Sequence, residues 1–223
     1  RFPILAKILT DFDQAWVTSV LPELITDKSE ALAYQTDARR MLARFHERRD
    51  PDADVLALER SFAIPLKDPE SGTIHEITGR IDRIDRLPGG GFRIIDYKTS
   101  RTLLAEDTVR ANLQLALYHL AVQHMWPTLA KPRAPVEVAL SFVRHSEIIA
   151  VRLPASQLAR TKKEILDTIR EIETSDFPAR SSQRCAMSPN YLACPYFKDQ
   201  FRTEKPKIKG EHDKKYNIVI SFG

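Results

Sequence analysis

Apolar residues along the chain change from helical spacing to strict alternation and back, and these changes predict the order of the elements. Helical spacing predicts helices over residues 3–25, 28–47, 106–125 and 156–174. Alternation predicts strands over residues 54–67, 73–87, 91–99, 136–144 and 147–153. This order predicts an α/β fold in which helices flank one mixed sheet of about five strands.

The last part of the chain has no sustained hydrophobic period. A short helix near 190–201 and an apolar stretch at 216–222, which could add an edge strand, are the only elements expected there. We therefore predict three parts: an N-terminal helical part (1–50), a core (51–175) and a C-terminal extension (176–223).

Composition changes this picture little. Of the 223 residues, 43% are hydrophobic and 29% are charged, which is typical of a globular protein. No apolar run approaches the roughly 20 residues of a membrane helix, so no membrane partner is expected. Two cysteines are too few for a disulfide framework, which favours the reducing cytoplasm. The chain starts at Arg1 without a methionine, so the sequence is expected to be cropped or a fragment, and upstream signals stay open.

Charge permits a nucleic-acid partner without demonstrating one. The formal net charge is +4, and residues 198–215 hold seven basic residues against four acidic ones. This basic segment is either a solvated tail or a contact with DNA.

One hairpin carries the candidate chemistry. The stretch GFRIIDYKTS (91–100) is a buried strand that ends with Asp96 and Lys98 on one face. Pro88 and three glycines (89–91) stand immediately before Phe92 and predict a tight turn. If Arg86 pairs with Phe92 across this turn, Asp82 faces Asp96 at a Cβ distance of about 5 Å. A slip of one residue would put the two acids on opposite faces.

Two carboxylates this close repel each other unless a cation lies between them. Mg²⁺ or Mn²⁺ prefers such oxygen ligands, lowers the pKa of a bound water and neutralises phosphate charge. Lys98 beside them could orient that water or stabilise a phosphate oxygen. The arrangement predicts phosphodiester hydrolysis. The alternative for Asp96 and Lys98 is a surface ion pair.

Three further residues extend this set. Glu59 lies within the preceding strand and is either a third carboxylate at the metal or an exposed strand residue. Gln114 and Tyr118 are four residues apart and share a helix face. They either serve the site or close the helix onto the sheet as a polar pair.

The motifs GRIDRID, IIDYKTS and QLALY, in this order, closely resemble the RecB-like nucleases of the PD-(D/E)xK superfamily, over about residues 54–120. This group includes the nuclease domains of RecB- and AddB-type helicase–nucleases. The resemblance implies a restriction-endonuclease-like core. By position it makes Asp82 the first metal ligand, Asp96 the second acid and Lys98 the catalytic lysine. Gln114 and Tyr118 would position the substrate, and Glu59 matches a frequent acidic position.

The function implied by this resemblance is a Mg²⁺-dependent DNA nuclease in repair or recombination, linked to a helicase subunit or domain. Exonuclease or flap-type processing of DNA ends is expected, and the sequence does not separate it from endonuclease action. A catalytically silent nuclease fold that binds DNA or acts as a scaffold is the alternative. A restriction-like endonuclease that acts alone is weaker, because no recognition module is evident.

The sequence departs from the family pattern in two places. Ala6 and Phe2 occupy the positions of a histidine and a glycine in the family's first helix, so that histidine is upstream or absent, and His46 is a poor substitute. Cys185, Ser188 and Cys194 match the spacing of an iron–sulfur motif, but serine is a poor ligand for iron. We interpret the cysteines as a relic of a cluster site, now empty. A structural pair or chance spacing is the alternative, and zinc is less favoured.

Overall fold

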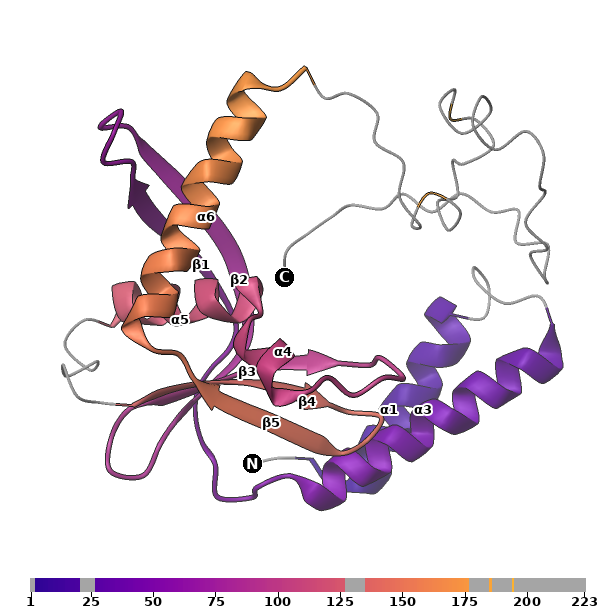
Figure 1. Cartoon of the computed structure of the whole chain (residues 1–223). Coiled ribbons are helices and arrows are strands. Elements are labelled where there is room, and N and C mark those ends of the chain that lie inside the picture. The colour runs from indigo at the N-terminus through magenta and orange to yellow at the C-terminus, as the bar shows by residue number, and fades with distance from the viewer. Residues whose placement is uncertain (1–2, 21–26, 127–134, 177–184, 186–193, 195–223) are drawn as a thin grey trace. The chain divides into compact units, whose positions relative to one another are not determined.

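The structure is a computed structural model of the chain, and it describes residues 3–20, 27–126 and 135–176 together with Cys185 and Cys194 (Figure 1). The helices are α1 (Leu5–Ala15), the π-helical turn η1 (Trp16–Val20), α3 (Lys28–Arg48), α4 (Glu106–Arg110), α5 (Leu113–Met125) and α6 (Ala155–Thr174). The strands are β1 (Asp54–Lys67), β2 (Ile74–Arg86), β3 (Phe92–Lys98), β4 (Val136–Phe142) and β5 (Glu147–Arg152).

The chain divides into two compact units, and the boundary between Lys162 and Lys163 falls within α6. All residues of the candidate active site belong to the first unit, whereas Cys185 and Cys194 belong to the second. The predicted division into parts 1–50, 51–175 and 176–223 stays a prediction.

The five strands form one mixed sheet in the order β1-β2-β3-β4-β5, which confirms the predicted fold class. Only β3 and β4 run parallel, and the other neighbours are antiparallel. Parallel neighbours need a crossover connection, and α4 and α5 provide it here. The crossover therefore places α5 against the sheet, beside the end of β3.

The register of the β2–β3 hairpin is the predicted one. Arg86 pairs with Phe92, and Ile84 pairs with Ile94. The paired residues end at Arg83, one residue before the level of Asp82 and Asp96. The hydrophobic face thus fixed the register, because a slip would have exposed Ile84 and Ile94, which are fully buried.

The core lies between the sheet and α5. Apolar side chains from β2, β3, β4 and α5 form one continuous buried cluster, which includes Ile84, Ile94, Val138, Leu140 and Val122. Within the described part of the chain, no helix combines the length and the apolar character that a membrane crossing requires.

Two helix predictions need correction. The expected helix 106–125 is divided into α4 and α5, because the chain leaves the helical path at Ala111 and Asn112. The first helix ends at Ala15 and continues as the π-helical turn η1. The segments expected near 190–201 and at 216–222 lie outside the described residues.

Asn112 caps the new start of α5. Its side-chain Oδ1 accepts a hydrogen bond from Leu115 N at 3.1 Å, which satisfies one of the free amides of the first turn. We expect Asn112→Ala to lower the free energy of unfolding by about 1 kcal/mol. The melting temperature, measured by circular dichroism, should fall by about 2–4 °C. Asn112→Asp keeps the acceptor, and an equal loss in that variant would contradict the capping role.

Helix α3 reaches the sheet near the end of β3. Asp27 caps α3 by accepting from Ser29 N at 2.7 Å. Further along α3, the ring of Phe45 meets the ring of Tyr97 edge-on, with 5.7 Å between their centroids. Because Tyr97 alternates with Asp96 and Lys98 along β3, α3 packs on the sheet face opposite to those two residues.

Candidate active site

Asp96 and Lys98 form an ion pair at the carboxyl end of β3. The Lys98 Nζ atom lies 2.7 Å from Oδ2 of Asp96. Asp96 is only 2% exposed, whereas the side chain of Lys98 is about one-third exposed. Among the described residues, the Lys98 ammonium group is the one polar partner of Asp96 Oδ2, which is otherwise buried without a hydrogen bond. The sequence had left a surface ion pair open, but the acid is buried.

Asp82 on β2 is held beside Asp96 and Lys98 by a hydrogen bond from the backbone of β3. Its Oδ2 atom accepts a hydrogen bond of 2.8 Å from Tyr97 N, the amide between Asp96 and Lys98. The backbone pairing of β2 with β3 ends at Arg83. Beyond that residue, the amide of Tyr97 donates to the side chain of Asp82 and not to a backbone oxygen of β2. This bond holds the two carboxylates at neighbouring positions.

A chain of hydrogen bonds links Lys98 to α5. Lys98 Nζ donates to Oε1 of Gln114 at 3.1 Å, and Gln114 Nε2 donates to the hydroxyl of Tyr118 at 2.9 Å. The amide of Gln114 is thus used on both sides, which fixes its orientation. The structure brings together Asp82, Asp96, Lys98, Gln114 and Tyr118.

Burial raises the pKa values of two groups at the site, the Asp96 carboxyl and the Tyr118 hydroxyl. Burial raises the pKa of Asp96; the Lys98 ammonium opposes this shift, and the charge of Asp82 adds to it. Burial also raises the pKa of Tyr118 to about 12, and the charges of Asp96 and Asp82 contribute. Both carboxylates therefore act on the same tyrosine hydroxyl, which stays protonated at neutral pH.

Gly79, the glycine of GRIDRID, makes room for an aromatic contact behind the site. It pairs with Phe62 across β1 and β2, and a Cβ atom at Gly79 would lie 2.7 Å from the Phe62 ring. The Phe62 ring in turn meets the ring of Tyr118 edge-on, with centroids 6.0 Å apart. The glycine therefore allows the packing that positions Tyr118.

Sequence reasoning missed a set of hydrogen bonds between Arg83, Asp85 and Tyr97 on the opposite face of the sheet. Arg83 binds Asp85 with both Nε and Nη2, at 2.6 and 2.8 Å, and its Nη1 donates to the Tyr97 hydroxyl at 3.4 Å. Phe45 packs on the same tyrosine ring. Tyr97 thus anchors β3 while its amide holds Asp82. The alternation of charges in GRIDRID was the available signal, because Arg83 and Asp85 share the face opposite to Asp82.

Glu59 is not brought to this cluster. Its backbone has a φ of 48°, which turns the residue away from regular strand geometry, and its exposed side chain pairs with Arg80 Nε at 3.1 Å. In α1, Ala6 is exposed, and His46 at the end of α3 contacts the backbone oxygen of Pro3 at 3.2 Å.

In the second unit, Cys185 and Cys194 are both half-buried, and neither forms a disulfide. Ser188 lies outside the described residues. The interpretation of these positions as a former iron–sulfur site stays a prediction.

The residues present fit a magnesium or manganese ion. No group of three or more His, Cys, Asp or Glu side chains suited to a metal occurs in the described part of the chain. Asp82 and Asp96 supply two carboxylates, and Mg²⁺ is commonly held by one or two carboxylates, waters and substrate phosphate oxygens. The buried Oδ2 of Asp96 has only the Lys98 ammonium group as a partner among the described residues, so a lone pair remains for such an ion.

The chain belongs to the PD-(D/E)XK nuclease superfamily, whose family description matches residues 5–197. Nucleases of this superfamily generally use divalent metals. The match places Asp82, Asp96 and Lys98 within a nuclease domain.

Two solved structures resemble the chain. One, the crystal structure of SSO0001, is 16% identical with a TM-score of 0.42, and the match covers 86% of this chain and 80% of that chain. The other is described as "Putative exonuclease" from Eubacterium rectale, with 16% identity, a TM-score of 0.45, and coverage of 92% of this chain and 78% of that one. No curated protein matches the chain significantly.

Proposed function

We propose that the protein is a Mg²⁺-dependent deoxyribonuclease that hydrolyses phosphodiester bonds in DNA at the site of Asp82, Asp96 and Lys98. The observation that carries this proposal is the convergence of two carboxylates and an ammonium group at the end of β3. The Asp96–Lys98 ion pair and the bond from Tyr97 N to Asp82 define that convergence. Burying such charges is costly, and a functional site is a sufficient reason to retain them.

Lys98 is the residue that acts on the phosphate. Its ammonium group has three donors, and two partners on the protein are Asp96 and Gln114. The third donor has no partner in the described part of the chain and can bind a phosphate oxygen or the attacking water. Because charge develops on the phosphate oxygens during hydrolysis, a positioned cation lowers the barrier. Gln114 also keeps the ammonium group of Lys98 in place when Asp96 binds the metal ion.

Asp82 and Asp96 would hold the metal ion. When bound, the ion would supply a lowered pKa for a coordinated water and neutralise charge on the scissile phosphate. The burial of Asp96 favours such a partner, because an ionised carboxylate away from water is stabilised by a nearby positive charge.

We further propose that the enzyme is RecB-like and processes DNA ends as an exonuclease in repair or recombination, in association with a helicase. The motifs GRIDRID, IIDYKTS and QLALY support this subtype.

A second candidate is a silent nuclease fold that binds DNA or acts as a scaffold. The exposed Ala6, in place of the family's histidine, favours this alternative, as does a donor set of only two carboxylates among the described residues. The hydrogen-bonded chain from Lys98 to Tyr118 favours the enzyme.

One assay separates the two candidates. The purified protein is incubated with end-labelled linear single- and double-stranded DNA, with Mg²⁺, with Mn²⁺ or with a chelator. The Lys98→Ala variant is the control. Cleavage that requires the metal and Lys98 supports the nuclease. Binding of DNA by both proteins without cleavage by either supports the silent module and refutes the nuclease.

Tyr118 provides a second test, because its hydroxyl accepts from Gln114 and has a pKa of about 12. We expect Tyr118→Phe to lower kcat by about 10- to 100-fold, since Gln114 then holds Lys98 less firmly. KM should change little. The pH–rate profile between about pH 6 and 10 should keep its shape, because Tyr118 does not ionise in that range. Tyr34→Phe on the exposed side of α3 is the matched control, and an equal loss of kcat there would contradict the role of Tyr118.

A further inference from the structure

The turn between β4 and β5 fixes the chain that follows Lys98. Val143 N donates to the backbone oxygen of Lys98 at 3.0 Å. Arg144 Nε donates to the backbone oxygen of Thr99 at 3.4 Å. The path of the chain after the candidate catalytic lysine is therefore set by this turn.

Arg101 is held in the same way. His145 Nε2 lies 3.0 Å from the backbone oxygen of Arg101, within hydrogen-bonding distance. The side chain of Arg101 is exposed and makes no hydrogen bond or ion pair within the described part of the chain. Its backbone is thus restrained while its guanidinium group stays available for a ligand.

Arg144 also joins this region to α3, because its guanidinium group donates to the Asp37 carboxylate. That hydrogen bond lowers the pKa of Asp37 against the effect of burial, and the charges of Arg144, Arg40 and Arg101 lower it further. Four charged side chains from three separate segments therefore lie within electrostatic reach of one another. We call Asp37, Arg40, Arg101 and Arg144 the Asp37 cluster.

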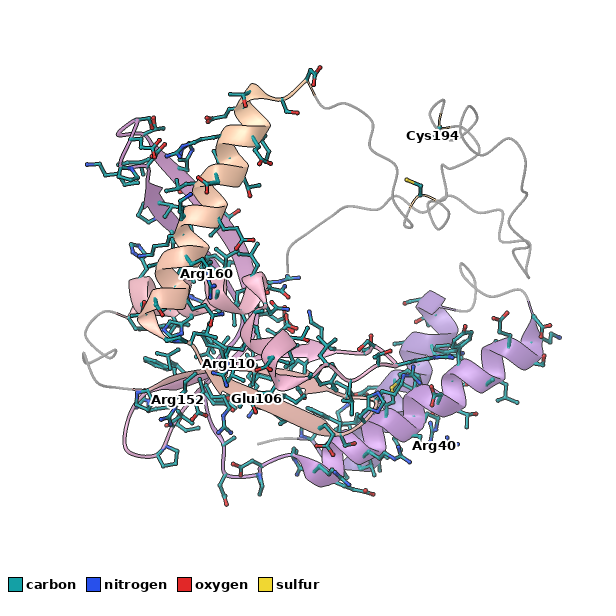
Figure 2. The ribbon with its side chains drawn as sticks, viewed as in Figure 1. Arg40, Glu106, Arg110, Arg152, Arg160 and Cys194 are labelled. Atoms are coloured by element: carbon teal, nitrogen blue, oxygen red, sulfur yellow. The ribbon has the colours of Figure 1, made fainter. Side chains whose placement is uncertain are left out.

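The Asp37 cluster has a surplus of two positive charges. Asp37 is occupied by Arg144, whereas the side chains of Arg40 and Arg101 have no hydrogen-bond or ion-pair partner among the described residues. Figure 2 shows Arg40 projecting outward from α3. Exposed arginines on one helix usually form a solvated face. Here Arg144 binds Asp37, and Arg40 follows Asp37 by three residues on α3. The backbone of Arg101 is held by the same turn that carries Arg144.

We propose that the Asp37 cluster binds a backbone phosphate of the DNA strand a few nucleotides from the scissile phosphate, a role that rests on the proposed nuclease function. Guanidinium groups bind phosphate oxygens through paired hydrogen bonds, which suits this ligand. Arg101 follows Lys98 by three residues, so their Cα atoms are at most about 11 Å apart. Since one strand of a duplex advances about 3.4 Å along the helix axis per phosphate, this upper limit on the Cα span corresponds to no more than about three nucleotides.

The test uses the Arg40→Gln/Arg101→Gln double variant, which leaves Arg144 and its contacts intact. Binding of labelled single-stranded DNA is measured by fluorescence anisotropy over a series of salt concentrations, with a chelator present to prevent cleavage. We expect roughly tenfold weaker binding at low salt, from two exposed charge contacts. The slope of log K against log salt should fall in magnitude by about 1.4, or about 0.7 for each lost phosphate contact.

Arg160→Gln is the matched control, because Arg160 is an exposed arginine on another helix, α6, and is not part of the Asp37 cluster (Figure 2). Its salt slope should equal that of the unchanged protein. A double variant with the unchanged slope would overturn the proposal, and so would an equal reduction in Arg160→Gln. Failure of the unchanged protein to bind DNA at all would also overturn it.

Cleavage assays separate this site from the catalytic one. In the double variant KM should rise about tenfold while kcat stays within about twofold, since the cluster holds substrate without touching the reacting atoms. A loss of kcat at constant KM would overturn the role in binding. If the unchanged protein binds DNA with the expected salt dependence but never cleaves it, the nuclease proposal fails and the phosphate site stands.

Discussion

The Lys98→Ala protein is expected to cleave DNA about 10³-fold more slowly than the unchanged protein, at any Mg²⁺ concentration. Lys98 is the cation that joins Asp96 to Gln114, at 2.7 and 3.1 Å. Its loss removes a positioned charge from the phosphate and leaves Gln114 without its donor. Loss of one such group typically costs a factor of 10² to 10⁴ in rate. Single-turnover cleavage of end-labelled DNA measures the effect.

DNA affinity should be nearly unaffected by the same change, because one partly exposed charge contributes about 1 kcal/mol or less to binding. Lys98→Arg should retain only part of the activity, since a planar guanidinium group does not take the position of an ammonium. Lys67→Ala, at the exposed end of β1, is the matched control and should cleave normally. If Lys98→Ala cleaved within about threefold of the unchanged protein, Lys98 would have no catalytic role.

The hairpin that carries the site was predictable from the sequence because every signal in it is local. Alternation in β2 and β3 marks one apolar face, and the glycines before Phe92 set the turn. Together they leave one register that buries both Ile84 and Ile94. Asp82, Asp96 and Lys98 follow from that register, since residues two apart on a strand share a face.

The position of Glu59 was not predictable from alternation. In a regular strand, the side chain of Glu59 would lie on the same face as those of residues 57 and 61. Its φ of 48° breaks that geometry, and the side chain instead pairs with Arg80. A positive φ at a glutamate is rare and leaves no pattern in a single sequence.

Contacts between distant segments were also beyond the reach of the sequence. Arg144 and Asp37 are 107 residues apart along the chain, and Phe45 and Tyr97 lie on different elements. Hydrophobic periodicity predicts that α3 has a buried face but does not specify which strand it meets. The break at Asn112 was missed because the apolar spacing continues across it.

The Asp96→Asn protein is expected to lose at least about 10³-fold in cleavage rate and yet to be more stable than the unchanged protein without metal. Asp96 is 2% exposed, and burial raises its pKa in spite of Lys98. The ionised carboxylate therefore destabilises the folded state. A neutral amide of the same shape removes that effect, and a gain of about 1 kcal/mol is typical where function has required a strained site. The melting temperature should rise by about 2–4 °C.

The pH dependence gives the sign of this effect. A carboxyl whose pKa is raised on folding binds its proton more tightly in the folded state, so stability falls as pH rises from the ordinary value of 3.8 to the raised value. Asp96→Asn should therefore match the unchanged protein at the acid end of this window. The stability of Asp96→Asn relative to the unchanged protein should increase across this pH range and stay constant above it. Thermal melts in a series of buffers measure this difference.

Mg²⁺ should reverse the order of stability. Ligand that binds only the folded state raises the melting temperature, and the ion is expected to use Asp96 as a ligand. The unchanged protein should thus gain stability with added Mg²⁺, while Asp96→Asn should gain little. A similar gain in both proteins would show that Asp96 does not hold the ion.

Asp85→Asn is the matched control, because it makes the same chemical change at another buried acid. Asp85 is 8% exposed, but two hydrogen bonds tie it to Arg83. Its replacement leaves a guanidinium group without its partner, at an expected cost of about 3 kcal/mol. The melting temperature should fall by roughly 6–12 °C. If both variants lost stability alike, Asp96 would be an ordinary structural ion pair, and its burial would no longer argue for a metal at this site.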